Sequence, residues 1–316
     1  MEDALPDHVY VILNPASGAG AGRRVRSELE GALRERGIDF RIEETRGSGH
    51  ATDLAEAAAQ EGTPVVAVAG GDGTIHEVAN GLLRSGSAPV LSLLPIGTGN
   101  DFVKVVPGTR RRPEAYDTLA RGQIKPFDAA VMRWSGGEEF FVNAAGTGID
   151  VEVVHQIESL RRLPGALMYV SGLARALLRY RPVHLRVTRP DGPSIDRRVM
   201  LAAVSNGRCL GGAFRLTPQA EPDDGLLDLC VVSALGLGTA MRVAPKVLRG
   251  THMEHPSVTM ARGAAFELAT EGGEPLMLQL DGELRRLDVD RVRIEAVPGA
   301  LRVLTSREPY RMDGKG

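Results

Sequence analysis

One short stretch of the chain combines glycines and a carboxylate in a way that could bind a phosphate. Residues 65–69 are small or branched apolar residues, and residues 70–74 read Gly-Gly-Asp-Gly-Thr. Glycines let the backbone approach a ligand, and the first turn of a following helix offers N–H groups that suit an anion. Asp72 would repel a phosphate unless a divalent cation lay between them. The pattern predicts a strand, a turn for magnesium and a nucleotide, and a helix; an ordinary turn capped by Thr74 is the alternative.

Two further loops of small and polar residues follow apolar strands. Residues 14–20 read Asn-Pro-Ala-Ser-Gly-Ala-Gly after residues 9–13, with a helix expected from about Gly22, and residues 95–102 read Pro-Ile-Gly-Thr-Gly-Asn-Asp-Phe after residues 90–94. Strands that alternate with helices specify a parallel sheet whose ligand loops lie at the carboxyl ends of the strands. We therefore expect the three loops on one edge of an α/β sheet. Taken alone, Asp72 or Asp101 could instead be an ordinary turn or cap residue.

The pattern changes near residue 127. Short β-rich segments separated by glycine and proline are typical of an antiparallel sandwich or barrel, and we expect them at 127–133, 140–143, 183–188, 199–205, 226–232, 257–260 and 276–280. Two helical stretches, 149–160 and 166–180, interrupt them. The second is flanked by arginines, so it could lie on an anionic bilayer; packing against its own sandwich is the simpler interpretation. The predicted fold class is α/β, with an N-terminal parallel-sheet nucleotide domain and a C-terminal antiparallel β-sandwich domain.

Composition limits the class of protein. A length of 316 residues with 43% hydrophobic residues suggests two globular domains. The formal net charge of -2 gives no reason to expect nucleic acid as a partner. Cys209 and Cys230 are isolated in apolar runs, which favours buried thiols and a reducing, cytoplasmic compartment. Residues 1–8 do not resemble a signal peptide, and no apolar run is long enough to span a membrane. Residues 252–255, His-Met-Glu-His, are expected to form a solvated loop rather than a metal site.

Several motifs together resemble the diacylglycerol kinase catalytic family of soluble lipid kinases, which is related to NAD kinases and phosphofructokinases. The dinucleotide fingerprint and the P-loop are both absent. The matching segments, in order and spacing, are residues 14–18, 70–74, 95–102 and 280–283 (Leu-Asp-Gly-Glu), with further family-like segments at 204–207, 211–214 and 223–229. The resemblance implies a nucleotide-binding domain over residues 1–126, to which residues 298–316 return, and a β-sandwich lipid-substrate domain over residues 127–297. Lys104 departs from the arginine that the family often has there.

The resemblance also implies a reaction, the transfer of the γ-phosphoryl group of ATP to a lipid hydroxyl, with Mg²⁺ directed by Asp72 and Asp101. Glu283 matches the proton acceptor of the family, although Asp-Gly-Glu alone is a common hairpin turn. The implied nucleotide contacts are Asn14, Pro15, Ala16, Ser17, Gly18, Thr45, Gly70, Gly71, Asp72, Gly73, Thr74, Ile75, His76 and Thr98. A structural magnesium is implied at Asp224, the Leu226 carbonyl and Glu221, with an Asp-Gly turn as the alternative.

The acceptor and the partners follow from the same resemblance. Diacylglycerol is the first expectation, and a sphingoid base, a polyprenol or a glycolipid would suit the same kind of apolar cleft. The expected partners are ATP, a lipid substrate and a transient contact with the inner face of a membrane, while a homodimer stays open. The rival interpretations are an NAD kinase-like or other small-molecule kinase and a non-catalytic lipid-binding protein. The presence of Asp72, Asp101 and Glu283 disfavours the non-catalytic interpretation.

Overall fold

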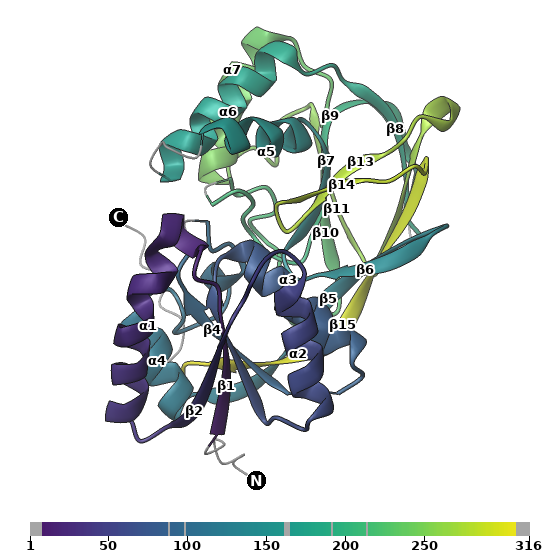
Figure 1. The fold of residues 1–316 in the computed structure, drawn as a ribbon. Helices are drawn as coiled ribbons and strands as arrows, with labels where there is room; N and C mark the ends of the chain where they lie inside the picture. Colours follow the sequence, from purple (N-terminus) through teal and green to yellow (C-terminus); the bar gives the residue numbers. More distant parts are fainter. Residues whose placement is uncertain are drawn as a thin grey trace. The chain divides into compact units, whose positions relative to one another are not determined.

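The chain folds into two compact units. The computed structural model describes residues 8–87, 89–97, 99–160, 165–190, 192–212 and 214–307. The first unit comprises the residues up to Phe127 and those from Gly299 onward, and the second comprises Asp128–Pro298 (Figure 1). Strands β5 (Gln123–Trp134) and β15 (Arg291–Thr305) contribute residues to both units. The predicted fold class, a parallel α/β unit followed by an antiparallel sandwich-like unit, is confirmed.

The first unit is built on a parallel sheet with the strand order β15-β4-β3-β1-β2. Arg302 and Val303 of β15 pair in parallel with Val90 and Leu91. Every residue of β3 and β4 is buried, as expected for parallel strands that are covered on both faces. The other strands of this sheet are β1 (His8–Leu13), β2 (Asp39–Glu44), β3 (Val65–Gly70) and β4 (Val90–Pro95).

Helices cover both faces of this sheet. They are α1 (Ser17–Glu35), α2 (His50–Gln60), α3 (Asp72–Arg84) and α4 (Arg112–Arg121). Helices α1 and α4 pack against the same side of β1 and β3, and α2 and α3 lie on the opposite side (Figure 1). The expected start of α1 near Gly22 was wrong. The helix begins at Ser17, and its first turn contains Gly18 and Gly20 with φ of 60° and 85°, a conformation that glycine adopts without strain.

The second unit is mainly antiparallel. Its strands pair in the order β14-β13-β7-β9-β8-β12-β15, with β10 joining β9 and β11, and β6 joining β5. The sequence pattern did not indicate β7, β12 or β14. Apolar side chains from many of these strands pack together in a buried core. Phe141, Leu229 and Phe266 are among them. The strands are β6 (Gly137–Phe141), β7 (Ala144–Gly148), β8 (Val183–Thr188), β9 (Ile195–Ser205), β10 (Leu227–Ser233), β11 (Val258–Gly263), β12 (Ala265–Thr270), β13 (Met277–Leu280) and β14 (Glu283–Arg286).

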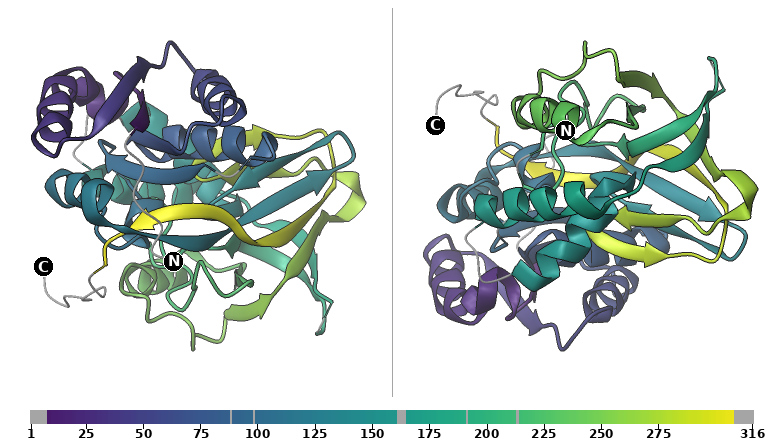
Figure 2. Two further views of the ribbon diagram at one scale, coloured as in Figure 1. Left: turned by 90° about the horizontal axis from the view of Figure 1, so that it is seen from below. Right: turned by 90° about the horizontal axis from the view of Figure 1, so that it is seen from above.

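Three helices gather on one side of the second unit, as Figures 1 and 2 show. Helices α5 (Ile149–Leu160) and α6 (Gly165–Arg179) confirm the two expected stretches within one residue, whereas α7 (Leu237–Arg249) was not expected. Ala176 of α6 is fully buried and Leu173 and Leu177 pack against the same core, so α6 packs on its own unit. No helix in the described part of the chain is long and apolar enough to cross a membrane.

Candidate active site

The loops of the first unit meet at the carboxyl edge of the sheet through backbone contacts that only glycine permits. A Cβ atom on Gly97 would lie 2.5 Å from the Cα atom of Gly71, and a Cβ atom on Gly18 would collide with the carbonyl oxygen of Ile96. The loops after β1, β3 and β4 therefore form one continuous surface. Any larger side chain at these positions would push the loops apart.

Asn14 joins the first of these loops to the start of α3. Its Nδ2 donates a hydrogen bond to Oγ1 of Thr74 at 2.9 Å, and its Oδ1 accepts one from the N–H of Ala16 at 2.9 Å. Gly71 precedes α3, and no side chain among the described residues caps that helix end. The first N–H groups of α3 and its positive dipole end are therefore available to an anion.

Asp72 and Asp101, which come from different loops, are hydrogen-bonded neighbours. Oδ1 of Asp72 accepts a hydrogen bond from the backbone N–H of Asp101 at 2.6 Å. Oδ1 of Asp101 lies 2.8 Å from Nζ of Lys104, a residue to which the sequence analysis gave no role. Burial of the Asp72 carboxyl group, together with the negative charge of Asp101, raises the pKa of Asp72 to about 7. A cation at this edge would offset that repulsion.

Asn100, which directly precedes Asp101, carries a further side-chain oxygen that could take part in binding. Its Oδ1 is buried without a hydrogen-bond partner in the described structure, while its Nδ2 donates to the carbonyl oxygen of Gly97 at 2.7 Å. Asn100 has φ of 50°, a left-handed conformation that asparagine tolerates better than most residues. Carboxylate and amide oxygens are the ligands that Mg²⁺ prefers. The donors present at this edge therefore fit a magnesium ion.

The other residues predicted to contact the nucleotide differ in whether they can reach a ligand. Ile75 is 1% exposed and its N–H donates to the carbonyl oxygen of Gly71, so it supports the turn. His76 is 3% exposed inside α3, next to Asn80. The N–H of Thr45 donates to the carbonyl oxygen at the end of β1, which fixes the loop after β2 to the same edge. Thr98 lies outside the described residues.

The third predicted catalytic acid lies on the hairpin between β13 and β14. Asp281 and Gly282 have φ of 50° and 90° and form the turn. The Asp281 carboxylate accepts hydrogen bonds from the N–H groups of residues 142, 143 and 144 at 3.0, 2.9 and 3.0 Å, and Oε1 of Gln279 accepts one from the N–H of Gly282 at 2.7 Å. The turn is thereby fixed to the start of β7. Glu283, the first residue of β14, is exposed.

A buried acid beside this hairpin was missed by the sequence analysis. Asp150 of α5 lies directly over Gly146 of β7, where a Cβ atom would overlap with the Asp150 carboxylate. Nε2 of Gln279 donates to Oδ2 of Asp150 at 3.4 Å. Burial raises the pKa of Asp150 to about 7. The one sequence signal was Gly146 itself, because a glycine inside a strand often marks a close approach by another group.

The residues of the predicted structural magnesium site lie at a loop before β10. Oδ1 of Asp224 accepts a hydrogen bond from the N–H of Leu226 at 2.9 Å, so the Asp-Gly turn is present. Arg262 lies 3.4 Å from Asp224 and 3.3 Å from Asp228, and it already supplies positive charge there. Glu221 is exposed. Among the described residues, no group of three or more His, Cys, Asp or Glu side chains is arranged to hold a metal. The site stays a prediction.

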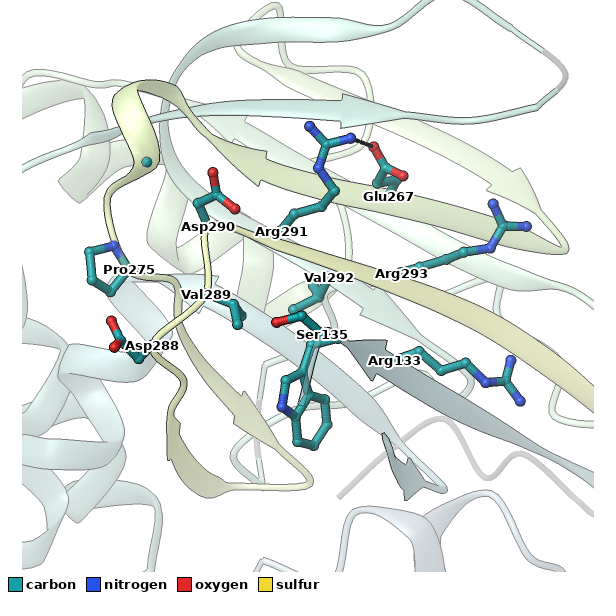
Figure 3. A pocket seen from close by; sticks show the side chains of 12 residues that line it. Arg133, Ser135, Glu267, Pro275, Asp288, Val289, Asp290, Arg291, Val292 and Arg293 are labelled. Atoms are coloured by element: carbon teal, nitrogen blue, oxygen red, sulfur yellow. Dashed lines mark hydrogen bonds and ion pairs between the residues drawn. The ribbon is translucent and has the colours of Figure 1, made fainter. Parts of the chain in front are cut away.

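A cavity of about 470 Å³ opens in another part of the second unit, beside β12, β15 and the turn after β5 (Figure 3). None of the predicted site residues lines it. Trp134 and three arginines do, but each arginine is neutralised by a glutamate: Arg133 by Glu138, Arg291 by Glu267, and Arg293 by Glu295. The cavity therefore offers little to an anionic ligand.

Comparison with protein families defines the class. A model of the diacylglycerol kinase catalytic domain matches residues 8–132, and a model of the YegS C-terminal NAD kinase beta sandwich-like domain matches residues 143–305. The first match contains the glycine loops with Asp72 and Asp101, and the second contains Glu283. A parallel α/β unit of the first kind followed by a sandwich of the second kind defines a lipid kinase of two domains.

Individual relatives agree with this class. The diacylglycerol kinase of Bacillus subtilis (strain 168) is 30% identical over 276 residues, which cover 86% of this chain and 88% of the relative. A "probable lipid kinase YegS-like" of Xanthomonas euvesicatoria pv. vesicatoria (strain 85-10) is 33% identical over 305 residues, which cover 94% of this chain and 96% of the relative. The crystal structure of a diacylglycerol kinase from Bacillus anthracis str. Sterne shares the fold, with a TM-score of 0.72 at 23% identity over 95% of this chain and 97% of that one.

The chain belongs to the diacylglycerol kinase family and is a lipid kinase. This membership confirms the resemblance that the motifs indicated. It also favours a lipid kinase over the NAD kinase-like and the non-catalytic interpretations.

Proposed function

We propose that the first unit binds ATP with Mg²⁺ and that the enzyme transfers the γ-phosphoryl group to the hydroxyl of a lipid, with diacylglycerol as the first acceptor to test. The observation that carries this proposal is the 2.6 Å hydrogen bond between Asp72 and Asp101 at the edge formed by the glycine loops. It gathers two carboxylates at the start of α3, where a helix end attracts phosphate oxygens and acids attract a cation.

Each group at this edge has a distinct role. The first N–H groups of α3, with Asn14 and Ser17, hold the phosphates. Asp72, Asp101 and the Oδ1 atom of Asn100 would hold the cation, and its positive charge would neutralise charge on the phosphate oxygens. Lys104 keeps the Asp101 carboxylate in place through its 2.8 Å ion pair.

Glu283 is the group that we assign to the acceptor. The lipid hydroxyl oxygen attacks the γ-phosphorus, the bond to the bridging oxygen breaks, ADP leaves, and Glu283 takes the hydroxyl proton. A positioned base of this kind contributes roughly 100- to 10,000-fold to a rate. The support for this role is that the hairpin is fixed by Asp281 and Gln279 while the Glu283 carboxylate remains exposed.

The proposal assigns a nucleotide-binding role to residues 1–126 with 298–316 and a lipid-substrate role to residues 127–297. Because its acceptor is a lipid, the enzyme would work in transient contact with the inner face of a membrane. A second, structural magnesium at Asp224, Leu226 and Glu221 is part of the proposal. It predicts that, in the presence of magnesium, Asp224→Ala has a lower melting temperature than the wild type.

A labelled-ATP assay tests the reaction. Purified enzyme receives γ-labelled ATP and Mg²⁺ together with diacylglycerol, a sphingoid base, a polyprenol, a glycolipid or NAD in separate reactions. We expect the label in diacylglycerol or another lipid, only when Mg²⁺ is present, and no label with Asp101→Asn. Label in NAD but in none of the lipids would overturn the proposal. Mass spectrometry of extracted lipids after incubation with ATP extends the search to acceptors outside this set.

A further inference from the structure

Helix α7 exposes apolar side chains that its packing does not use. Leu237 is 46% exposed and Met241 is 62% exposed, and the exposed Pro245 continues the same four-residue spacing. Residues at this spacing lie along one face of a helix. This apolar stripe, Leu237, Met241 and Pro245, is distinct from the buried side of α7, which consists of Ala240, Val243 and Val247.

A cationic stripe runs beside the apolar one. It consists of Arg242, Lys246 and Arg249, which are all exposed and also lie three or four positions apart. None of the three forms an ion pair with an acidic residue that the structure describes. Arg215, whose N–H donates to the carbonyl oxygen of Val247, adds another exposed cation next to the end of the helix. Helix α7 contains no Asp or Glu, in a chain whose formal net charge is -2.

Ordinary stabilisation of a helix explains only part of this pattern. Cations in the last turn, here Lys246 and Arg249, favour the negative end of the helix dipole. The dipole gives no reason for exposed Leu237 and Met241 at the other end. Helix α6, which packs beside α7, adds another exposed leucine, Leu178, at 73% (Figure 1). Apolar residues next to cations, on a helix that already has a buried side, are typical of a helix that lies in the surface of a membrane.

We propose that this face of α7 docks on the surface of a bilayer rich in anionic phospholipid. The apolar stripe enters the head-group region, and the cationic stripe contacts the lipid phosphates. A second copy of the chain is the less suitable occupant, because two copies of this face would bring like charges together. The inference rests on the proposed function, since a kinase with a lipid acceptor must reach that acceptor at a bilayer.

Sedimentation with vesicles, without ATP, tests the docking face. We expect binding to vesicles of phosphatidylglycerol and phosphatidylcholine, little binding to phosphatidylcholine alone, and weaker binding as salt is raised. Met241→Ser should weaken binding about tenfold by removing apolar burial. Lys246→Gln should weaken it about fivefold by removing one cation. The matched controls are Met277→Ser, at a methionine of β13 that is 45% exposed, and Lys125→Gln, at an exposed lysine of β5; both should bind like the wild type.

Activity on a short-chain diacylglycerol that dissolves without vesicles separates docking from catalysis. We expect Met241→Ser and Lys246→Gln to keep wild-type activity on this substrate and to lose activity on vesicles. If the enzyme phosphorylates no lipid but the vesicle results hold, the proposed function fails and the docking face stands. Wild-type vesicle binding by both variants would overturn the inference. Light scattering that shows Met241→Ser converting a dimer to a monomer, with vesicle binding unchanged, would assign the face to a second copy instead.

Discussion

The two regions that carry the candidate catalytic acids are held in place by opposite means. In the first unit, Gly71 and Gly97 allow two backbones to touch, and Asp72 accepts the backbone N–H of Asp101 at that contact. In the second unit, the Asp281 carboxylate accepts three consecutive N–H groups and fixes the turn that presents Glu283. The first region is possible because Gly71 and Gly97 have no Cβ atom. The second region is held by the side chain of Asp281. Substitutions should therefore damage them in different ways.

The largest effect is expected at the acid that the second region presents. Glu283→Gln keeps the size and the exposure of the side chain but cannot accept a proton. We expect kcat to fall by roughly 100- to 10,000-fold, with an unchanged melting temperature. A labelled-ATP assay and a thermal melt of the same preparation measure both. Near-native turnover would remove Glu283 from the mechanism.

The next largest effect is expected at the residue that holds this turn. Asp281→Ala leaves three buried N–H groups without their acceptor, and we expect the free energy of unfolding to fall by about 3–5 kcal/mol. Asp281→Asn keeps one acceptor oxygen and tolerates the φ of 50°, so it should lose less. Chemical denaturation of both variants gives the comparison. Equal, small losses would show that the turn is not held by this carboxylate.

The glycine contact of the first unit should tolerate no added atom. In Gly97→Ala the new Cβ would lie 2.5 Å from the Cα of Gly71, so we expect a loss of about 3 kcal/mol in stability and weakened ATP binding. Gly31→Ala is the matched control. Its Cβ would meet nothing within 4 Å in helix α1, so this variant should gain about 0.5–1 kcal/mol. If Gly97→Ala binds ATP like the wild type, the loops are not held by this contact.

A smaller, pH-dependent effect is expected at Asp150. Its pKa is raised from 3.8 to about 7 in the folded protein, so the unfolded chain ionises first as the pH rises. Stability present below pH 3.8 is therefore lost progressively up to about pH 7. Asp150→Asn has no carboxyl group to ionise and lacks this loss. The free energy of unfolding of the variant minus that of the wild type should therefore increase by about 2 kcal/mol as the pH is raised from mildly acidic to mildly basic. A constant difference across that range would contradict the buried, neutral carboxyl group.

The sequence predicted the parts of the fold that have clear periodicity. Strand β3 and helix α3 follow from five apolar residues and the spacing of Ile75, Val78 and Ala79. Helix α7 was missed because Gly238 and Pro245 weaken a helical pattern, although Ala240, Val243 and Val247 keep the spacing of a buried side. Strand β12 was missed because it depends on pairing with β8 and β15, which are distant in the sequence. Strand β14 pairs with its neighbour β13, but three of its four residues are charged and it lacks an apolar pattern.

The contacts that position the candidate site were also not predictable from local sequence. The motifs identified Asp72, Asp101 and Glu283, but the contacts that position them are long-range. No local pattern shows that Asp281 accepts N–H groups from residues 142–144, or that Asp150 lies over Gly146. Residues 252–255 form the expected loop, but one of them is not solvated, for the same reason. His252 is fully buried, with Nε2 3.8 Å from the Sγ atom of Cys230, because strand β10 and helix α7 enclose it.

Calorimetric titration with ATP tests the central claim, that acids at the glycine edge bind the nucleotide through a magnesium ion. We predict saturable binding by the wild type in the presence of Mg²⁺, loss of binding when Mg²⁺ is removed, and loss of binding in Asp72→Asn even when Mg²⁺ is supplied. ATP binding that is equally tight without Mg²⁺ and in Asp72→Asn would contradict the claim.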